Sequence, residues 1–212
     1  MDVSQSTIDR YTQSDPDVRL MLRVAGDDAL AFEELMRRYQ NRVVGVLAHL
    51  VGRRDMAEDL AQDVFLRVYR ARDRYVPASK FSTWLFTITN NVALNALRSL
   101  SRRKEVNITP KATDESGGNP IEVAALAASG LMPTRQLDKS EMSEVVRLAV
   151  ECLNERQRMA VLLAKFEQLS YAEIGEVMDM TPQAIKSLLS RARANLRGIL
   201  EPYLEQGEAI KT

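Results

Sequence analysis

Hydrophobic residues along this chain recur at intervals of three and four residues, and no alternation of apolar and polar residues persists. That spacing places apolar side chains on one face of an α-helix, whereas a half-buried strand needs a period of two. No apolar run in the 212 residues approaches the length of a membrane-spanning helix. The sequence therefore predicts an all-α fold without membrane insertion.

A polar stretch rich in Gly, Pro, Ser and Thr, NITPKATDESGGNP, interrupts the helical pattern. This composition is typical of a flexible linker. It divides the chain into a helical domain at residues 15–104, a linker at 105–137 and a second helical domain at 138–203. Within the linker, an N-cap asparagine, a proline and a final glycine predict a short apolar helix at 119–130, whose path the sequence does not indicate.

Local signals predict several helix ends. In the first domain, helices at about 17–25 and 28–51 are expected to end at Gly26 and Gly52. Asp55 and Glu58 have the spacing of a capping box at the start of the next helix. In the second domain the predicted N-caps are Asn154, Ser170 and Thr181. Gln157 and Glu173 follow the first two by three residues, and Pro182 directly follows Thr181 at the first helical position.

Net charge is zero, with 29 basic and 29 acidic residues, but the charges are segregated along the chain. Such a protein can present basic faces to a polyanion and acidic faces to another partner. The single cysteine, Cys152, and the single histidine, His49, exclude a disulfide scaffold and argue against a Cys/His metal site. We expect no cofactor. A reducing compartment fits, the polar N-terminus is unlike a signal peptide, and a cytoplasmic protein is expected.

Two helices separated by the short break Asp179–Thr181 predict a helix-turn-helix at the end of the second domain. The last helix has no acidic residue between Thr181 and Leu200. Helical projection gives it an inward apolar stripe and an outward polar and basic face, comprising Gln183, Lys186, Ser187, Ser190, Arg193 and Arg197. Short polar groups can reach base edges and guanidinium groups suit phosphates, which favours DNA binding. The alternative is a solvated basic face on an ordinary bundle.

The stretch KFSTWLFTITNNVALNALRSLSRR, residues 80–103, predicts one long helix. A polar stripe on it becomes cationic toward its end and comprises Thr83, Thr87, Asn91, Asn95, Arg98 and Arg102. Amides and hydroxyls can bond base edges, and arginines can neutralise phosphates. Tyr75 and Phe81, in and after the preceding loop, carry rings that can stack on an exposed base. A plain solvated face remains the alternative.

The segment AEDLAQDVF carries a third candidate surface, with Glu58, Asp59 and Asp63 close together on one helix. Three interpretations are open. Two carboxylates four residues apart can hold a metal or transfer protons, but no third ligand or histidine is near. A solvated face is the second. The third is a protein-docking face in which Phe65 is an apolar anchor rimmed by charge.

Together these segments resemble a known family. GDDALAFEELMRRYQNRV, AEDLAQDVFLRVYRARDRY, FSTWLFTITNNVALNALR and LNERQRMAVLLAKFEQLSYAEIGEVMDMTPQAIKSLLSRARANLR are similar to the bacterial sigma factors of the extracytoplasmic-function (ECF) group. The resemblance covers about residues 18–200, interrupted only by the linker. It implies a non-enzymatic protein that binds core RNA polymerase and directs it to promoters, with a role in a stress or envelope response and an anti-sigma factor as partner.

The resemblance also implies site residues. The polymerase-docking segment matches Asp59, Gln62, Asp63 and Phe65. The part that opens the −10 element and captures a flipped base matches Tyr75, Lys80, Phe81, Thr87, Asn91, Asn95, Arg98 and Arg102. The −35 reader matches Thr181, Gln183, Lys186, Ser187, Ser190, Arg191 and Arg193. Leu188 departs from the family, which often has arginine there, so the preferred −35 bases cannot be transferred from relatives.

Three rival functions are distinguishable from this one. A stand-alone helix-turn-helix regulator would bind operators without polymerase, and the acidic helix argues against it. An enzyme would need a nucleophile–base pair, a metal cluster or a phosphate loop, none of which the sequence offers. An adaptor that sequesters other proteins would show no promoter preference.

Overall fold

The structure is a computed structural model that describes residues 4–107 and 139–208. These two stretches contain helices and no strand, so the all-α prediction is confirmed. The predicted linker and its helix at 119–130 lie almost entirely outside the described residues. In chain order the elements are α1 (Gln5–Ser14), α2 (Pro16–Ala25), α3 (Ala29–Val51), α4 (Arg54–Arg70), the 3-10 turn η1 (Arg72–Arg74), α5 (Phe81–Asn107), α7 (Lys139–Glu151), α8 (Glu155–Lys165), α9 (Tyr171–Met178) and α10 (Pro182–Glu208).

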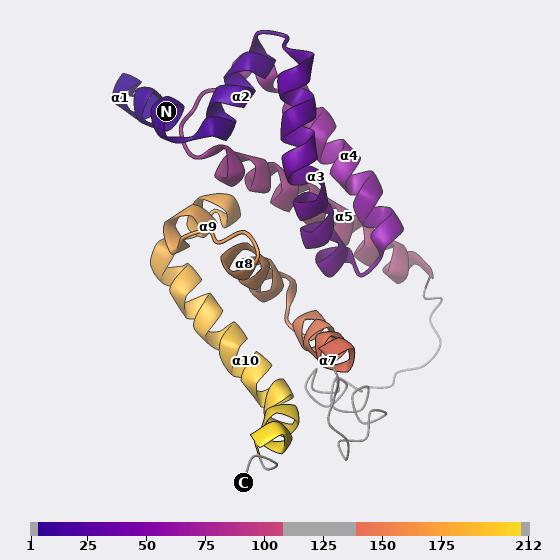
Figure 1. Ribbon diagram of the computed structural model, residues 1–212. Coiled ribbons are helices and arrows are strands. Elements are labelled where there is room, and N and C mark those ends of the chain that lie inside the picture. The colour runs from indigo at the N-terminus through magenta and orange to yellow at the C-terminus, as the bar shows by residue number, and fades with distance from the viewer. Residues whose placement is uncertain (1–3, 108–138, 209–212) are drawn as a thin grey trace.

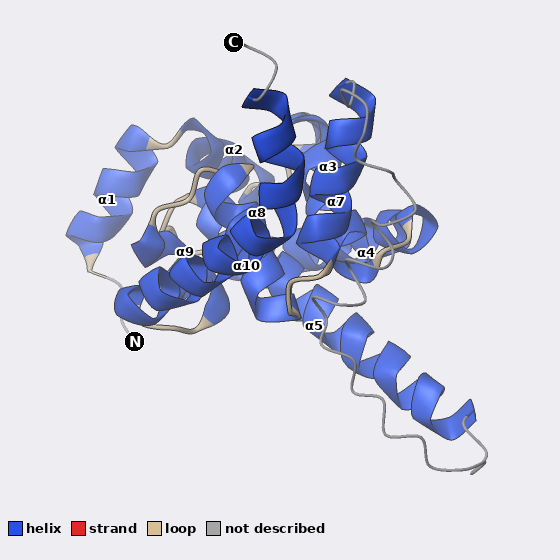
Figure 2. Ribbon diagram, turned by 90° about the horizontal axis from the view of Figure 1, so that it is seen from below, coloured by secondary structure: helices blue, strands red, loops and turns tan. Residues whose placement is uncertain are grey.

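The N-terminal unit is a bundle in which α3 and α4 lie side by side and α5 crosses both (Figures 1 and 2). Its core is filled by large side chains that are fully buried, including Met21, Leu35, Leu47, Phe81 and Phe86. These residues come from α2, α3 and α5. The three helices therefore share one apolar interior, and α5 is held along its first three turns.

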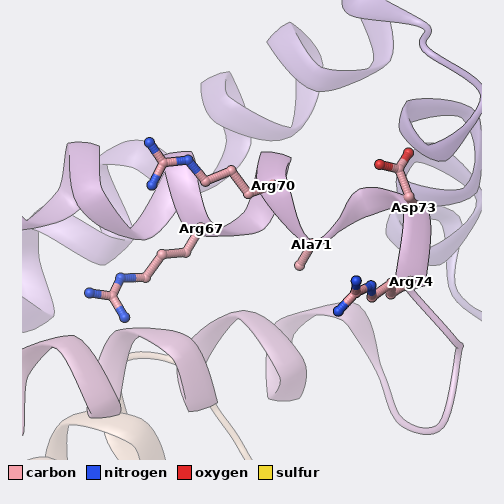
Figure 3. Close-up of a pocket in the computed structure, with 5 residues that line it drawn as sticks. All are labelled: Arg67, Arg70, Ala71, Asp73 and Arg74. Atoms are coloured by element: carbon pink, nitrogen blue, oxygen red, sulfur yellow. The ribbon is translucent and has the colours of Figure 1, made fainter.

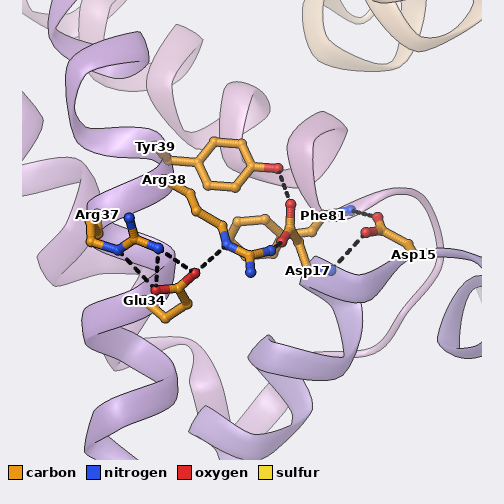
Figure 4. A network of polar contacts seen from close by, with 7 residues as sticks. All are labelled: Asp15, Asp17, Glu34, Arg37, Arg38, Tyr39 and Phe81. Carbon is orange, nitrogen blue, oxygen red and sulfur yellow. Dashed lines mark hydrogen bonds and ion pairs between the residues drawn. The ribbon is translucent and has the colours of Figure 1, made fainter.

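Asp15, Asp17 and Glu34 organise a polar network at one end of this unit (Figure 4). Asp15 accepts hydrogen bonds from the backbone N–H of Asp17 and of Phe81, each at 2.9 Å. Asp17 accepts from the hydroxyl of Tyr39 at 2.6 Å and pairs with Arg38, which also pairs with Glu34. The network caps α2 and also fixes the first residue of α5, because one carboxylate bonds both helix starts.

Several predicted helix ends are confirmed, and one is wrong. Asp28 caps α3, and Gly52 ends it in the left-handed conformation at φ +72°. For α4 the N-cap is Arg53 and no side-chain capping bond forms, so Asp55 lies inside the first turn. The reason is competition for the carboxylates: Arg53 pairs with Asp55, and Arg54 pairs with Glu58. The Arg53 guanidinium also lowers the pKa of Asp55.

Helix α1 was not predicted, because the first domain was expected to begin at residue 15. None of its residues is buried, so it has no apolar stripe that would indicate a helix. Arg19 donates hydrogen bonds to the carbonyl oxygens of Thr12 and Gln13 at 3.1 and 2.8 Å. A cation at the C-terminal end of a helix compensates its unpaired carbonyl groups.

The C-terminal unit consists of α7, α8, α9 and α10, and α9 with α10 form the predicted helix-turn-helix. Asn154 accepts from the N–H of Gln157, Ser170 and Glu173 form a complete capping box, and Thr181 accepts from the N–H of Ala184. The inward stripe is also confirmed, since Ile185, Leu189 and Ala192 are buried, with Leu196 and Leu200 half-buried. Leu188, the residue that departs from the family pattern, is buried.

Gly175 allows the helix-turn-helix to turn sharply, and replacing it with alanine is expected to unfold the motif at lower temperature. A Cβ atom at Gly175 would lie 2.5 Å from the carbonyl oxygen of Met180. The backbone of Met180 is held at this place, because its N–H donates to the carbonyl oxygen of Gly175 at 2.9 Å. Overpacking of this kind costs roughly 1–3 kcal/mol. Thermal unfolding followed by circular dichroism measures it. Gly198→Ala is the matched control, because nothing lies within 4 Å and helical alanine is favoured there.

Candidate nucleic-acid and protein interfaces

The acidic surface of α4 is exposed but differs from the predicted one. Asp59 and Gln62 are exposed, and Asp63 is partly exposed and paired with Arg67 at 3.0 Å. Phe65 is only 4% exposed, so the prediction that it anchors a partner is not supported by its position in the core. It continues the buried stripe of Ala61, four residues earlier.

Two other side chains supply the apolar part of this face. Leu66 is 52% exposed and follows Asp63 by three residues and Gln62 by four. Tyr69 is 40% exposed and follows Leu66 by three residues on the same side of α4. Exposed leucine and tyrosine beside carboxylates form the apolar centre and charged rim that protein interfaces use. The sequence signal for both residues is their helical spacing, because Leu66 and Tyr69 follow Asp59 by seven and ten residues and so share its side of the helix. We call Asp59, Gln62, Asp63, Leu66 and Tyr69 the α4 face.

The aromatic rings expected to stack on a base are packed inside the N-terminal unit. Phe81 is fully buried, with its ring 5.2 Å from that of Tyr39. Tyr75 is 9% exposed and lies edge-on to Trp84, with ring centroids 4.8 Å apart. In this conformation neither ring is available to a base, because aromatic contacts and core packing already cover them. Burial raises the pKa of Tyr75 as well.

The polar stripe of α5 is covered at its start and open further along. Thr83 is buried, and Thr87 is half-buried with its hydroxyl bonded to the carbonyl of Thr83 at 2.9 Å. The next four stripe residues are exposed: Asn91, Asn95, Arg98 and Arg102. We call these four the α5 face. It combines amide groups with two guanidinium groups, and α5 carries no acidic residue between Phe81 and Lys104.

A basic pocket lies where α4 passes into η1, and the sequence did not predict it. Arg67, Arg70, Ala71, Asp73 and Arg74 surround a cavity of about 480 Å³ (Figure 3). Arg67 is paired with Asp63, whereas within the described ranges Arg70 and Arg74 have no ion pair and are exposed. Unpaired guanidinium groups around a hollow can hold phosphate oxygens. The signal was hidden because acidic Asp73 interrupts the run of arginines.

Helix α10 presents the predicted outward residues to solvent. The N-cap Thr181 is exposed, and so are the helix residues Gln183, Lys186, Ser187, Ser190, Arg191, Arg193 and Arg197. The Arg193 side chain is oriented by α9, because its guanidinium donates a hydrogen bond to the Tyr171 hydroxyl at 3.0 Å. Arg191 Nε lies 3.4 Å from the carbonyl of Ser187. Short polar groups therefore occupy the first turns, and guanidinium groups follow, which is the order suited to base edges and then phosphates.

Two family models match this chain: Sigma-70 region 2 at residues 35–103, and Sigma-70, region 4 at residues 143–196. The chain is 32% identical over 190 residues to the ECF RNA polymerase sigma-E factor of Escherichia coli (strain K12), covering 88% of this chain and 95% of the relative. It is 31% identical over 195 residues to the RNA polymerase sigma-H factor of Pseudomonas aeruginosa, covering 90% and 96%.

Solved structures with the same fold include CnrH in complex with the cytosolic domain of CnrY, with a TM-score of 0.63 at 20% identity over 88% of this chain and 98% of that chain. A second is the sigma factor RpoE from Bartonella quintana in complex with the anti-sigma factor NepR, with a TM-score of 0.60 at 23% identity over 80% and 96%.

In the described ranges no helix has both the length and the apolarity that crossing a bilayer requires. The family matches cover both helical units in the expected order, and the relatives extend over most of the chain. The chain therefore belongs to the ECF sigma factors, non-enzymatic initiation factors that direct RNA polymerase to specific promoters.

Proposed function

We propose that this sigma factor reads two promoter boxes with two separate surfaces, the −10 element with the α5 face and the −35 element with α10. One observation carries the proposal: both helices have exposed, amide- or hydroxyl-bearing turns followed by arginines, and neither stretch contains an acidic residue from Phe81 to Lys104 or from Pro182 to Leu200. Uninterrupted positive charge on both surfaces favours binding to the DNA backbone.

At the −10 element, Asn91 and Asn95 hydrogen-bond an extruded base while Arg98 and Arg102 contact phosphates. Extruding a base costs a few kcal/mol, and contacts to a base are worth roughly 1–3 kcal/mol. Capture therefore offsets much of the cost of melting. Arg70 and Arg74, in the basic pocket of the same N-terminal unit, contact further phosphates. Lys80 belongs to the −10 surface as well. Thr87 supports this surface indirectly, because its hydroxyl bonds the Thr83 carbonyl oxygen within α5.

The exposed position of the basic pocket supports that role, while the burial of Tyr75 and Phe81 assigns them a different one. Both rings lie in the core at the start of α5. They hold the helix that carries Asn91 rather than stacking on DNA. A core aromatic residue fixes the angle of the reading helix, which contributes to specificity without contact with the promoter.

At the −35 element, Gln183, Lys186, Ser187 and Ser190 reach base edges, and Arg191 and Arg193 contact phosphates. Thr181 mainly caps α10 through its bond to the Ala184 N–H at 3.2 Å. Core polymerase binds the α4 face, where Asp59, Gln62 and Asp63 supply the charge. Buried Phe65 supports that face from beneath.

The Arg191→Ala/Arg193→Ala variant is expected to weaken holoenzyme binding at all −35 sequences by a similar factor. Each phosphate contact contributes about 0.9 to the slope of log affinity against log salt concentration, so the slope should fall by nearly 2. Fluorescence anisotropy of labelled promoter DNA over a salt series measures it. Arg156→Ala, which removes an exposed arginine of α8, is the control. An unchanged slope in the double variant means that these arginines do not contact phosphates.

Run-off transcription with purified core polymerase on a library of randomised promoters tests the two-box proposal as a whole. Transcripts should come from templates sharing two short boxes at a constant spacing, and the protein should form a stable complex with polymerase in gel filtration. A stand-alone regulator would select DNA without polymerase. Selection of a single box would remove one of the two reading surfaces from the proposal.

An anti-sigma factor is the proposed regulatory partner, in a cytoplasmic stress or envelope response. Support comes from the fold neighbours, since CnrH was solved with CnrY and RpoE with the anti-sigma factor NepR. The absence of a spanning helix in the described ranges is compatible with that location. Affinity purification of the tagged protein from unstressed cells should recover one stoichiometric protein besides polymerase subunits, which stress should release.

A further inference from the structure

The start of α5 is capped by a side chain from a distant part of the chain. Lys80 stands at the N-cap position, because its carbonyl oxygen accepts a helical bond from the Trp84 N–H at 3.2 Å. A lysine side chain has no acceptor, so it cannot bond the free N–H groups of the first turn. Asp15 supplies the acceptor instead, with Oδ2 2.9 Å from the backbone N of Phe81 (Figure 4). The helix that carries the α5 face is therefore capped from 66 positions earlier in the sequence.

The same carboxylate caps α2. Asp15 Oδ1 accepts from the Asp17 N–H at 2.9 Å, so its two oxygens serve the starts of two helices. A negative charge is favourable at the positive end of a helix dipole, and here it faces two such ends. Helix α2 is itself firmly seated, since Val18, Met21 and Val24 are buried. The bond therefore ties the start of α5 to an element that is packed into the core.

The connection from α4 to α5 is also held at its other end by a residue next to α2. Asp27, in the turn that follows α2, pairs with Arg72 of η1 at 3.0 Å, and α2 contacts η1 directly. Asp27 adopts a left-handed φ of +62°, which residues other than glycine rarely do. Arg72 and Phe81 flank the loop at 75–80. Carboxylates at the two ends of α2 therefore hold the two ends of this loop.

The Asp15 charge acts on both ends of the loop as well. Burial is the main cause of the raised pKa of Tyr75, and the Asp15 charge adds to it. For Lys80 the bond to Glu173 is the main cause of the raised pKa, and the Asp15 charge contributes in the same direction. The carboxylate that caps α5 therefore lies within electrostatic reach of the first and last residues of the loop.

The element held in this way carries the α5 face. Asn91 follows Phe81 by ten residues on one continuous helix, which places it about 15 Å along the axis at 1.5 Å per residue. A tilt at the start of a stiff helix displaces every group further along it. The buried Phe81 ring fixes this start through packing, and the bond to Asp15 fixes its backbone. The direction in which Asn91 presents its amide therefore depends on a carboxylate that lies outside α5.

We propose that Asp15 is a positioning residue for promoter opening, which orients the −10 reading helix through its bond to the Phe81 N–H and makes no contact with DNA itself. The inference rests on the proposed reading of the −10 element by the α5 face. Asp15 precedes the segment, residues 35–103, that matches Sigma-70 region 2. Loss of the bond should slow promoter opening and leave the polymerase affinity unchanged, because the α4 face is on another helix.

Asp15→Ser separates the two bonds of this side chain. Serine is a good N-cap and can keep the bond to the Asp17 N–H, but its single hydroxyl is too short to reach the Phe81 N–H as well. With holoenzyme on a duplex promoter selected by run-off, permanganate reactivity should show opening slowed roughly ten-fold, which corresponds to about 1.4 kcal/mol. On a template whose −10 box is already unpaired, the variant should initiate at the parent rate, because no melting remains to be assisted.

Asp28→Ser is the matched control. Asp28 also caps a helix, because it accepts from the Ala31 N–H at 3.1 Å, and it also has a second partner, Arg23, at 2.7 Å. The same substitution is thus made at a second cap, away from α5, and opening should stay at the parent rate. Asp15→Asn covers the case in which serine impairs folding, as judged by circular dichroism. It keeps the side-chain shape but only one acceptor oxygen, and should slow opening by a smaller factor.

Three results overturn the positioning role. The first is opening at the parent rate by both Asp15 variants. The second is equal slowing by Asp28→Ser, which indicates general loosening of the unit. The third is slowing that persists on the unpaired template, which places the defect after opening. Asn91→Ala in the same assay tests the proposed function separately. If that variant opens at the parent rate, the α5 face does not read the −10 element; if it is slow while the Asp15 variants are not, only the positioning role is lost.

Discussion

Replacement of Asp63 by arginine is expected to weaken binding to core RNA polymerase roughly thirty-fold or more, equivalent to about 2 kcal/mol. Asp63 lies within the α4 face, between Asp59 and Leu66. Its carboxylate is paired with Arg67 at 3.0 Å, yet 41% of the side chain is exposed to a partner. An arginine at this position removes a negative charge, adds a positive one and repels Arg67. A partner surface that complements the acidic α4 face would then meet like charge.

Titration of fluorescent core polymerase with the sigma factor measures the affinity. Circular dichroism must show unchanged helix content, because an exposed i,i+4 ion pair contributes only a few tenths of a kcal/mol to stability. Asp9→Arg makes the same charge change on exposed α1, outside the matched family segments, and should leave the affinity unaltered. Equal affinity of Asp63→Arg and the parent would remove α4 from the polymerase interface.

Features determined by neighbouring residues were predictable from the sequence. Asn154, Ser170 and Thr181 each accept a backbone N–H from the residue three positions on, and such bonds depend only on local geometry. Gly52 adopts the left-handed conformation that glycine favours. The helix-turn-helix and its outward face follow from these ends together with the apolar period. Asp55 shows the limit, since a nearby arginine competes for the same carboxylate.

Features that depend on distant partners were not predictable. Phe65, Tyr75 and Phe81 are aromatic residues beside polar ones, and only packing decides whether such rings face a partner or the core. The burial of Phe65 was the easiest of the three to predict, because the helical period of α4 places it on the same side as buried Ala61. Tyr75 and Phe81 are buried by rings from other helices. The basic pocket needs the chain to turn at η1, which brings Arg74 back toward Arg67 and Arg70.

Asn90 and Asn91 illustrate the same limit within two consecutive residues. Both are amides in the middle of one helix, and their propensities are identical. Adjacent positions on a helix point about 100° apart, so only one of them can lie in a given contact. The interface with α9 decides which, since Asn90 is buried against Val177 and Asn91 is exposed. The sequence carries no local signal for an interface formed by residues nearly 90 positions apart.

This pair also gives the second prediction of large effect. Asn91→Ala is expected to slow promoter opening roughly 5- to 150-fold, because contacts to a captured base are worth roughly 1–3 kcal/mol. Binding to core polymerase should not change, since the α4 face lies on another helix. Permanganate reactivity of unpaired thymines follows opening over time, and polymerase titration follows binding. The two measurements separate loss of base capture from loss of assembly.

Asn90→Ala is the matched control, with the same atoms removed one residue away. Its buried amide donates to the carbonyl oxygen of Val177 in α9, so the variant should loosen the contact between the two units and leave opening by the assembled holoenzyme at the parent rate. If Asn91→Ala reduces polymerase binding as much as opening, the α5 face is part of the docking surface. If Asn90→Ala slows opening and Asn91→Ala does not, the base contacts the other side of α5, the side that faces α9 in the structure. The second result would move the reading surface by about 100° around one helix.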